Sequence, residues 1–295
     1  MIRRLEPRAA KEAARRAGRG QMDRRLGLTS ASSLVVANMI GAGVFTTSGF
    51  ALADLGRPEP VLLAWVVGGV LALFGALSYG ALARRIPESG GEYTFLSRTI
   101  HPVAGFLAGW VSLLAGFTAP IAAAALGLQA YLGESFGLGE NPRWVGYAAI
   151  LGAGLLHALR WREGVWIQNV AVALKLAAIG LFVGFALYAL PARPESVGGG
   201  WGDVEVGAFA VTLVWISFSY SGWNAAVYVA GEVRDPARNL SRSLVLATAT
   251  VAVIYIALNA VFLYAAPVDA LAGHAEVGAI AAEALGGIGL RRAIS

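Results

Sequence analysis

Long apolar runs, separated by short polar segments, occupy most of the chain after residue 27. A helix needs about 20 mostly apolar residues to cross the hydrocarbon core of a bilayer. The pattern therefore predicts an all-α membrane protein with about seven transmembrane helices. The predicted spans are Leu28–Leu52, Val61–Ala83, Val103–Leu132, Trp144–Leu159, Gly164–Leu190, Val206–Ala230 and Leu244–Ala266.

This pattern divides the chain into three parts. Residues 1–26 form a basic tail, residues 27–266 form the seven-span transmembrane domain, and residues 267–295 form a second tail that holds charged residues and several glycines. The second tail has no room for another full span. We therefore expect it to lead to an eighth span that is missing from the chain.

Basic residues are concentrated on one side of the predicted membrane. Seventeen Lys and Arg residues lie in the first tail and in the loops after spans 2, 4 and 6, whereas the alternate loops contain only Arg57, Arg143 and Arg193. Loops rich in Lys and Arg remain in the cytoplasm. We therefore expect an integral protein of the cytoplasmic membrane, with the lipid bilayer around it, a cytoplasmic N-terminus and an extracytoplasmic segment 267–295.

Composition excludes several classes of function. Only 14% of the residues are charged, against about 25% in soluble domains. The net charge of +5 follows from the topology, and no nucleic-acid partner is expected because no motif for binding RNA or DNA occurs. The chain has no cysteine, three widely separated histidines and no hydrolase or P-loop motif, so we predict no metal, no cofactor and no enzymatic activity.

Glycines interrupt the first span at mid-membrane depth. Gly41 and Gly43 flank Ala42, and each glycine lowers helix propensity by about 1 kcal/mol. The helix can unwind here, although unwound backbone is tolerated at this depth only against protein or a water-filled cavity. A packing face of small residues is the alternative explanation.

Polar residues interrupt the sixth span in a similar way. Ser219, Tyr220, Ser221 and Asn224 surround Gly222 within an otherwise apolar run. Polar side chains at this depth need partners in the interior of a helix bundle. The segment is therefore either part of a ligand site or a set of interhelical hydrogen bonds without a ligand.

The two interruptions occupy corresponding positions, because spans 1 and 6 are the first helices of two possible five-helix units. Inverted repeats place a broken helix at the same point of each unit, with the substrate between them. A broken helix exposes N–H groups on one half, which suit a carboxylate, and C=O groups on the other half, which suit an ammonium. The pair of breaks predicts a site for the zwitterion of an α-amino acid.

Three segments resemble a known family. Residues 41–45 (GAGVF), 87–93 (PESGGEY) and 232–240 (EVRDPARNL) resemble, in order and in topological position, signatures of the amino-acid permeases of the amino acid–polyamine–organocation superfamily. Residues 218–224 (FSYSGWN) resemble its L-type branch. The resemblance implies a LeuT-type fold, of which the chain would contain the first five-helix repeat and two helices of the second.

The resemblance also implies a function and a site. The function is secondary active transport of amino acids, driven by a proton gradient or a counter-substrate. The substrate carboxylate is expected at the N–H groups of Ala42 and Gly43, and Phe218 is expected to gate the site. Gly41, Gly43 and Gly222 are the expected helix breaks. The full set of substrate-binding residues is Met39, Ala42, Gly43, Phe218, Ser219, Ser221, Trp223 and Asn224.

Within this set, the substrate amine is expected near the backbone carbonyls of Met39, Phe218, Ser219 and Ser221. Trp223 and Asn224 are expected to shape the pocket or the helix break, and the family often has Glu at the position of Asn224. The alternative function is a truncated membrane protein that binds or interacts without transporting, because the second repeat is incomplete.

Lys175 is the only basic residue inside any predicted span. A charge at this depth costs at least about 2.5–3.5 kcal/mol. Lys175 either reaches a water-filled vestibule without a further role, or it loads and releases a proton during transport. Its segment, with Gln168 and Asn169, resembles the fifth span of proton-coupled permeases, in which a lysine ammonium replaces a sodium ion. We predict that Lys175 is the proton-coupling residue and that it binds carbonyls freed by the break in span 1.

Overall fold

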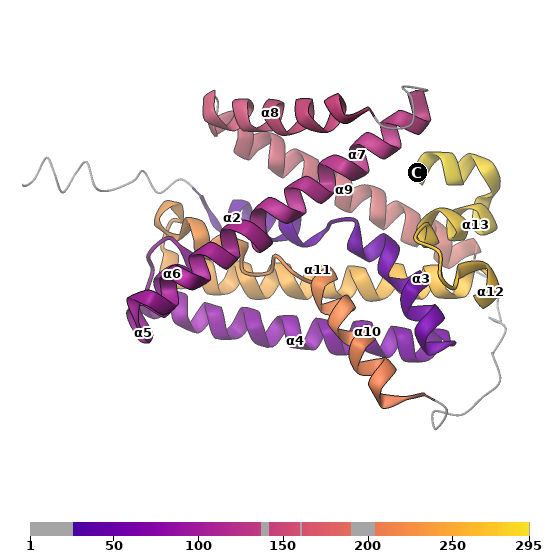
Figure 1. Ribbon diagram of the computed structural model, residues 1–295, viewed down its shortest axis with the longest axis horizontal. Coiled ribbons are helices and arrows are strands. Elements are labelled where there is room, and N and C mark those ends of the chain that lie inside the picture. Colours follow the sequence, from indigo (N-terminus) through magenta and orange to yellow (C-terminus); the bar gives the residue numbers. More distant parts are fainter. Residues whose placement is uncertain (1–25, 137–141, 160, 190–203, 295) are drawn as a thin grey trace, which may run out of the picture.

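The computed structural model describes residues 26–136, 142–159, 161–189 and 204–294, and this part of the chain is folded into helices (Figure 1). The predicted all-α class is confirmed, while all of the first tail except Leu26 lies outside the described residues. The elements are α2 (Leu28–Met39), α3 (Gly43–Leu55), α4 (Pro58–Arg85), α5 (Gly91–Thr99), α6 (Pro102–Val111), the π-helix η1 (Ser112–Thr118), α7 (Ala119–Phe136), α8 (Arg143–Leu159), α9 (Trp161–Ala189), α10 (Val206–Ser219), the 3₁₀ helix η3 (Ala225–Glu232), α11 (Pro236–Ala265), α12 (Val268–Leu271) and α13 (Val277–Ile294).

Length and composition support fewer spans than the seven predicted. Within the described residues, four helical stretches are long and apolar enough to cross a membrane: Pro58–Arg85, Pro102–Gln129, Val165–Ala189 and Pro236–Ala265. The bent pair α2 and α3 becomes a fifth if it counts as one span. The predicted fourth span corresponds to α8, with 17 residues. The predicted sixth corresponds to α10, which has 14 residues because the helix ends where its polar segment begins.

Local signals explain where the long helices begin and end. α4 has Pro58 in its first turn, where a missing N–H costs nothing, and Arg84 and Arg85 in its last turn, where cations favour the helix dipole. α3 ends at Gly56, whose φ of 69° is the left-handed conformation that glycine adopts most readily. α11 also begins with a proline, Pro236.

The core lies where α11 packs along α4 and α2, while α10 crosses α4 and α3. Figure 1 shows α4 and α11 running side by side, with α10 across them. Small residues on α4 allow this approach: a Cβ added to Gly68 would lie 2.9 Å from a side-chain carbon of Ile216 in α10. Close backbone contact of this kind is how helices associate inside a bilayer.

Among the remaining helices, α9 and α13 pack against this core, whereas α7 and α8 lie outside it. α9 packs on α2 and α11, and α8 packs on α7. An 18-residue apolar window of Pro102–Gln129 has none of its residues buried by the described protein. The segment predicted as a second tail is helical, since it forms α12 and α13. α13 packs against α11 and α3, with a kink at Gly287.

Candidate functional site

The first span is broken at residues 40–42, at the glycines that predicted the interruption. α2 ends at Met39, α3 begins at Gly43, and the two helices meet at an angle of 40°. Among the described residues, no backbone carbonyl accepts from the N–H groups of Ala42 or Gly43, which lie at the start of α3. These N–H groups, together with the N-terminal dipole of a 13-residue helix, favour an anion at this point.

The carbonyl side of the break is held by two neighbouring helices. The Lys175 ammonium in α9 donates to the Ile40 carbonyl at 2.9 Å, so the expected contact between this lysine and the first break is present. The Met39 carbonyl accepts from the Tyr255 hydroxyl in α11 and from the Gly41 N–H at 2.9 Å. A carbonyl oxygen has two lone pairs, so both acceptor positions of the Met39 carbonyl are used in this structure.

The sixth span is also interrupted. α10 ends at Ser219, Gly222 has a φ of 99°, and a 3₁₀ helix, η3, follows in place of a continued α-helix. A side chain at Gly222 would be strained by this φ, and its Cβ would lie 2.7 Å from the Asn38 carbonyl oxygen. The glycine thus allows the second break to touch the end of α2.

A second close contact joins the two breaks. A Cβ added to Gly43 would lie 2.7 Å from the Ser219 hydroxyl and 3.2 Å from the Ser219 Cα. The Ser219 hydroxyl also forms a 2.8 Å hydrogen bond with the hydroxyl of Thr47 in α3. The tertiary structure therefore brings Gly43, Ser219 and Gly222 together from two segments far apart in the sequence.

The other predicted residues of the sixth span point in different directions. Ser221 is exposed, and its N–H donates to the Phe218 carbonyl at 3.0 Å. Trp223 packs edge-on against Tyr79 of α4, with ring centroids 4.8 Å apart. The Asn224 amide donates to the Glu92 carboxylate and lies 3.3 Å from the Tyr228 hydroxyl. Asn224 is thus joined to α5 in this structure.

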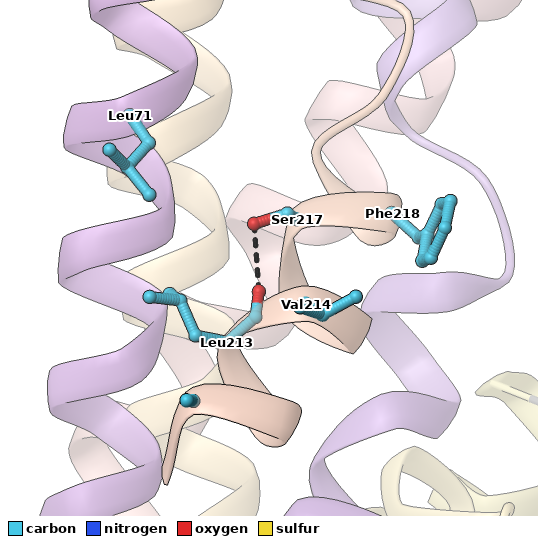
Figure 2. A pocket seen from close by; sticks show the side chains of 6 residues that line it. Leu71, Leu213, Val214, Ser217 and Phe218 are labelled. Atoms are coloured by element: carbon cyan, nitrogen blue, oxygen red, sulfur yellow. Dashed lines mark hydrogen bonds between the residues drawn. The ribbon is translucent and has the colours of Figure 1, made fainter. Parts of the chain in front are cut away.

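Phe218 lies on the outer face of α10 and is 66% exposed. It borders a hollow of about 390 Å³ between α4 and α10, with Leu71, Ala210, Leu213, Val214 and Ser217. Figure 2 shows its ring pointing away from Leu71, and it shows Ser217 donating back to the Leu213 carbonyl. The lining is apolar apart from Ser217 and contains no charged residue, so the hollow does not suit a carboxylate or an ammonium.

Glu92 was not among the predicted site residues, and the sequence did not predict that it pairs with Asn224 and Tyr228. The Glu92 carboxylate accepts from the Asn224 amide and the Tyr228 hydroxyl, and it also interacts with Tyr79. Gly91 packs against the Tyr228 ring, because a Cβ there would lie 2.5 Å from a ring carbon. The available signal was an acidic residue, Glu92, in the glycine-rich segment 87–93. Only the tertiary structure places its carboxylate against Asn224 and Tyr228.

The same loop is joined to the segment that follows the sixth span. The Gly231 N–H donates to the Ser89 hydroxyl at 2.8 Å, and Leu26 pairs with Val233 in an isolated bridge. The segments 87–93 and 232–240, which resemble family signatures, therefore meet at one end of the molecule, beside the start of α2.

A sequence model of the amino acid permease family matches residues 26–295. The chain belongs to the amino acid permease family. The b(0,+)-type amino acid transporter 1 of Homo sapiens is 29% identical to this permease over 246 residues, which are 81% of this chain and 50% of the relative. The serine/threonine exchanger SteT of Bacillus subtilis is 30% identical over 249 residues, which are 82% of this chain and 55% of the relative.

A third relative belongs to the L-type branch. The large neutral amino acids transporter small subunit 2 of Homo sapiens is 29% identical to this permease over 280 residues, 90% of the chain and 52% of the relative. The chain spans about half the length of the curated relatives it matches. These relatives are named as transporters and an exchanger, so the family, the predicted branch and the exclusion of an enzyme agree with the comparisons.

Proposed function

We propose that the protein carries out secondary active transport of amino acids across the cytoplasmic membrane, driven by protons or by a counter-substrate. The observation that carries the proposal is the contact between the two helix breaks, at Gly222 with Asn38 and at Gly43 with Ser219. Membership of the permease family and the names of the relatives support it. They do not favour the alternative of a membrane protein that binds without transporting.

We further propose a LeuT-type arrangement, in which residues 27–266 cross the membrane seven times and the N-terminus is cytoplasmic. Residues 267–295 would then be extracytoplasmic and precede the remaining helices of the second repeat. The broken helices α2–α3 and α10–η3 support this proposal, because in a LeuT-type arrangement they would be the first helices of the two five-helix units. The bias of Lys and Arg towards alternate loops supports the orientation.

The proposed substrate site lies between the breaks. The N–H groups of Ala42 and Gly43 would bind the carboxylate, because no backbone carbonyl among the described residues accepts from them. The backbone carbonyls of Met39, Phe218, Ser219 and Ser221 would bind the amine. In this structure the Met39 and Phe218 carbonyls each accept from two donors. Phe218 would gate the site, with Trp223 and Asn224 shaping it.

Uptake of a panel of radiolabelled amino acids tests this function. The complete reading frame that contains these residues is reconstituted in liposomes, and each amino acid is offered with and without an internal counter-substrate. We expect saturable uptake of at least one neutral amino acid. Absence of uptake and of exchange for the whole panel would contradict the proposal.

Coupling is proposed to reside in Lys175. Its 2.9 Å hydrogen bond to the Ile40 carbonyl braces α9 against the broken span, and loss of the proton would change the ammonium from a charged to a neutral donor. A coupling ion must favour one conformational state over another, and this bond would supply such a difference if only one state forms it. The Lys175→Met variant should still exchange substrate but should no longer concentrate it under an imposed proton gradient. Concentration by Lys175→Met equal to wild type would remove Lys175 from the coupling mechanism.

A further inference from the structure

Three aromatic residues form a buried cluster behind the two breaks. Trp65 of α4, Tyr220 at the end of α10 and Tyr255 of α11 are 0%, 1% and 0% exposed. The ring centroids lie 5.6 Å apart for Trp65 and Tyr220, 5.5 Å for Trp65 and Tyr255, and 5.1 Å for the two tyrosines. The cluster joins three helical segments, α4, α10 and α11, beside the interrupted backbone.

The two tyrosine hydroxyls donate to different kinds of backbone carbonyl. The Tyr220 hydroxyl binds the Trp65 carbonyl at 2.9 Å, which lies inside the continuous helix α4. The Tyr255 hydroxyl binds the Met39 carbonyl, which lies at the end of α2. In an unbroken helix that carbonyl would accept from the N–H four residues later, that of Gly43. The break removes this donor, and Tyr255 replaces it.

Water does not reach the Met39 position, because the residue is 2% exposed. A buried carbonyl that loses its donor costs free energy comparable to a lost hydrogen bond. The conformation of residues 40–42 therefore depends on the Tyr255 hydroxyl and on the short contact from the Gly41 N–H to the Met39 carbonyl.

A polar network holds Tyr255 in place. Its carbonyl accepts from the Asn259 amide at 2.8 Å, and the Asn259 side-chain oxygen accepts from the Ser48 hydroxyl. The Ser48 hydroxyl in turn accepts from the Trp65 indole N–H at 2.8 Å. Ser48 and Asn259 are both fully buried. A satisfied buried network of this kind rigidifies its members, so it fixes the α11 backbone at Tyr255 relative to α3 and α4, and the edge-on contact with Trp65 orients the Tyr255 ring.

We propose that Tyr255 is a positioning residue of the transport site: its hydroxyl stands in for the missing helical donor to the Met39 carbonyl and so fixes the unwound backbone of residues 40–42. Tyr255 and Lys175 hold adjacent carbonyls of the same break, one with a neutral hydroxyl and the other with an ammonium. The consequence for substrate affinity rests on the proposed function, whereas the consequence for the backbone does not.

A matched pair of variants tests the proposal. Tyr255→Phe and Tyr220→Phe each remove one buried hydroxyl from the same aromatic cluster, and each leaves one backbone carbonyl without that donor. Both variants should lose similar thermal stability in detergent. Only Tyr255→Phe should increase amide hydrogen exchange in the peptide that covers residues 40–45, by about tenfold, the factor that corresponds to ~1.4 kcal/mol.

The transport readout is made on the same two variants. For the substrate found in the uptake panel, Tyr255→Phe should raise KM about tenfold with a smaller change in maximal rate, whereas Tyr220→Phe should leave KM within about twofold of wild type. In a double-mutant cycle, the effects of Tyr255→Phe and Lys175→Met on hydrogen exchange should be non-additive, because both act on one break. The effects of Tyr220→Phe and Lys175→Met on hydrogen exchange should be additive.

Equal hydrogen exchange at residues 40–45 in the Tyr255→Phe and Tyr220→Phe proteins would overturn the proposal, whatever the transport result. If hydrogen exchange at residues 40–45 rises in Tyr255→Phe but KM does not change, Tyr255 has no role in the transport site. A wild-type protein that takes up no amino acid would instead contradict the proposed function, and the exchange measurement would still decide whether Tyr255 holds the break.

Discussion

Asn224 and Gly43 illustrate how single residues acquire their surroundings from distant parts of the chain. Asn224 is joined to the Glu92 carboxylate across 132 positions of sequence, and Gly43 lies against Ser219 of α10. Among the described residues, no Lys or Arg forms an ion pair with Glu92. The carboxylate is stabilised there by neutral donors.

The pairing of Glu92 with Asn224 predicts a charge-exchange rescue. Asn224→Asp places two carboxylates side by side, a repulsion of up to about 4 kcal/mol at a separation of about 4 Å in partly polar surroundings. We expect lower thermal stability and at least tenfold slower uptake for this variant. Glu92→Gln combined with Asn224→Asp restores one amide and one carboxylate, so it should recover most of both. A double variant no better than Asn224→Asp would show that the two side chains do not act as a pair.

The glycines of the first break are not equivalent, and this predicts different outcomes for the same substitution. A Cβ at Gly43 would lie 2.7 Å from the Ser219 hydroxyl, whereas nothing lies within 4 Å of a Cβ at Gly41. Gly43→Ala should destabilise the fold by about 1–3 kcal/mol through overpacking. Gly41→Ala should retain wild-type thermal stability but weaken substrate binding at least tenfold, because its methyl group enters the open space beside the break. Tight binding by Gly41→Ala would place the substrate elsewhere.

At the scale of elements, the breaks are the feature that organises the helices. α2 and α3 diverge by 40°, while α10 gives way to a 3₁₀ helix after Gly222. Each break requires partners for the backbone groups it frees. Side chains of α9 and α11 supply them at the first break, and both helices pack on α2.

The second break depends on the left-handed conformation of Gly222, so Gly222→Ala should be strongly destabilising. The alanine would combine backbone strain of about 1–3 kcal/mol with a contact 2.7 Å from the Asn38 carbonyl. Gly127→Ala is the matched control, because Gly127 lies in α7 and nothing is within 4 Å of an added Cβ. It should be neutral or stabilising by up to about 1 kcal/mol. Thermal unfolding in detergent measures both, and similar losses for the two variants would contradict a special role for Gly222.

At the scale of the molecule, α2, α3, α4, α10 and α11 form one packed body, and α6 to α9 lie beside it. The two loop segments that resemble family signatures meet at one end of this body, where the Gly231 N–H binds Ser89. The bias of basic residues predicts that this end faces the cytoplasm.

The orientation can be tested with single cysteines, because the sequence contains none of its own. Asp54 and Ile100 are exposed and lie in predicted loops on opposite sides of the membrane. In intact cells, a membrane-impermeant maleimide should label Asp54→Cys. It should label Ile100→Cys only after permeabilisation. The reverse pattern would show that the N-terminus is outside.

The sequence by itself determined the class of protein and the places where two helices are interrupted. Hydrophobicity over about 20 residues is a local property. Glycine lowers helix propensity whatever the tertiary structure, so Gly41, Gly43 and Gly222 could be identified as helix breaks from the sequence. The family resemblance also rests on local segments. The same reasoning could not establish the number of spans, since α8 and α10 are too short to qualify by length and composition.

Only the tertiary structure decided what faces the breaks. Tyr255 is 216 residues from Met39 and Lys175 is 135 residues from Ile40, and no periodicity along the chain encodes these distances. Lys175 was conspicuous as a charge in an apolar run, whereas Tyr255, Ser48 and Asn259 occur among residues that ordinary helix packing would explain equally well. The reason is physical: a freed carbonyl takes whichever donor the packed helices bring within reach, and helix packing depends on contacts between segments far apart in the sequence.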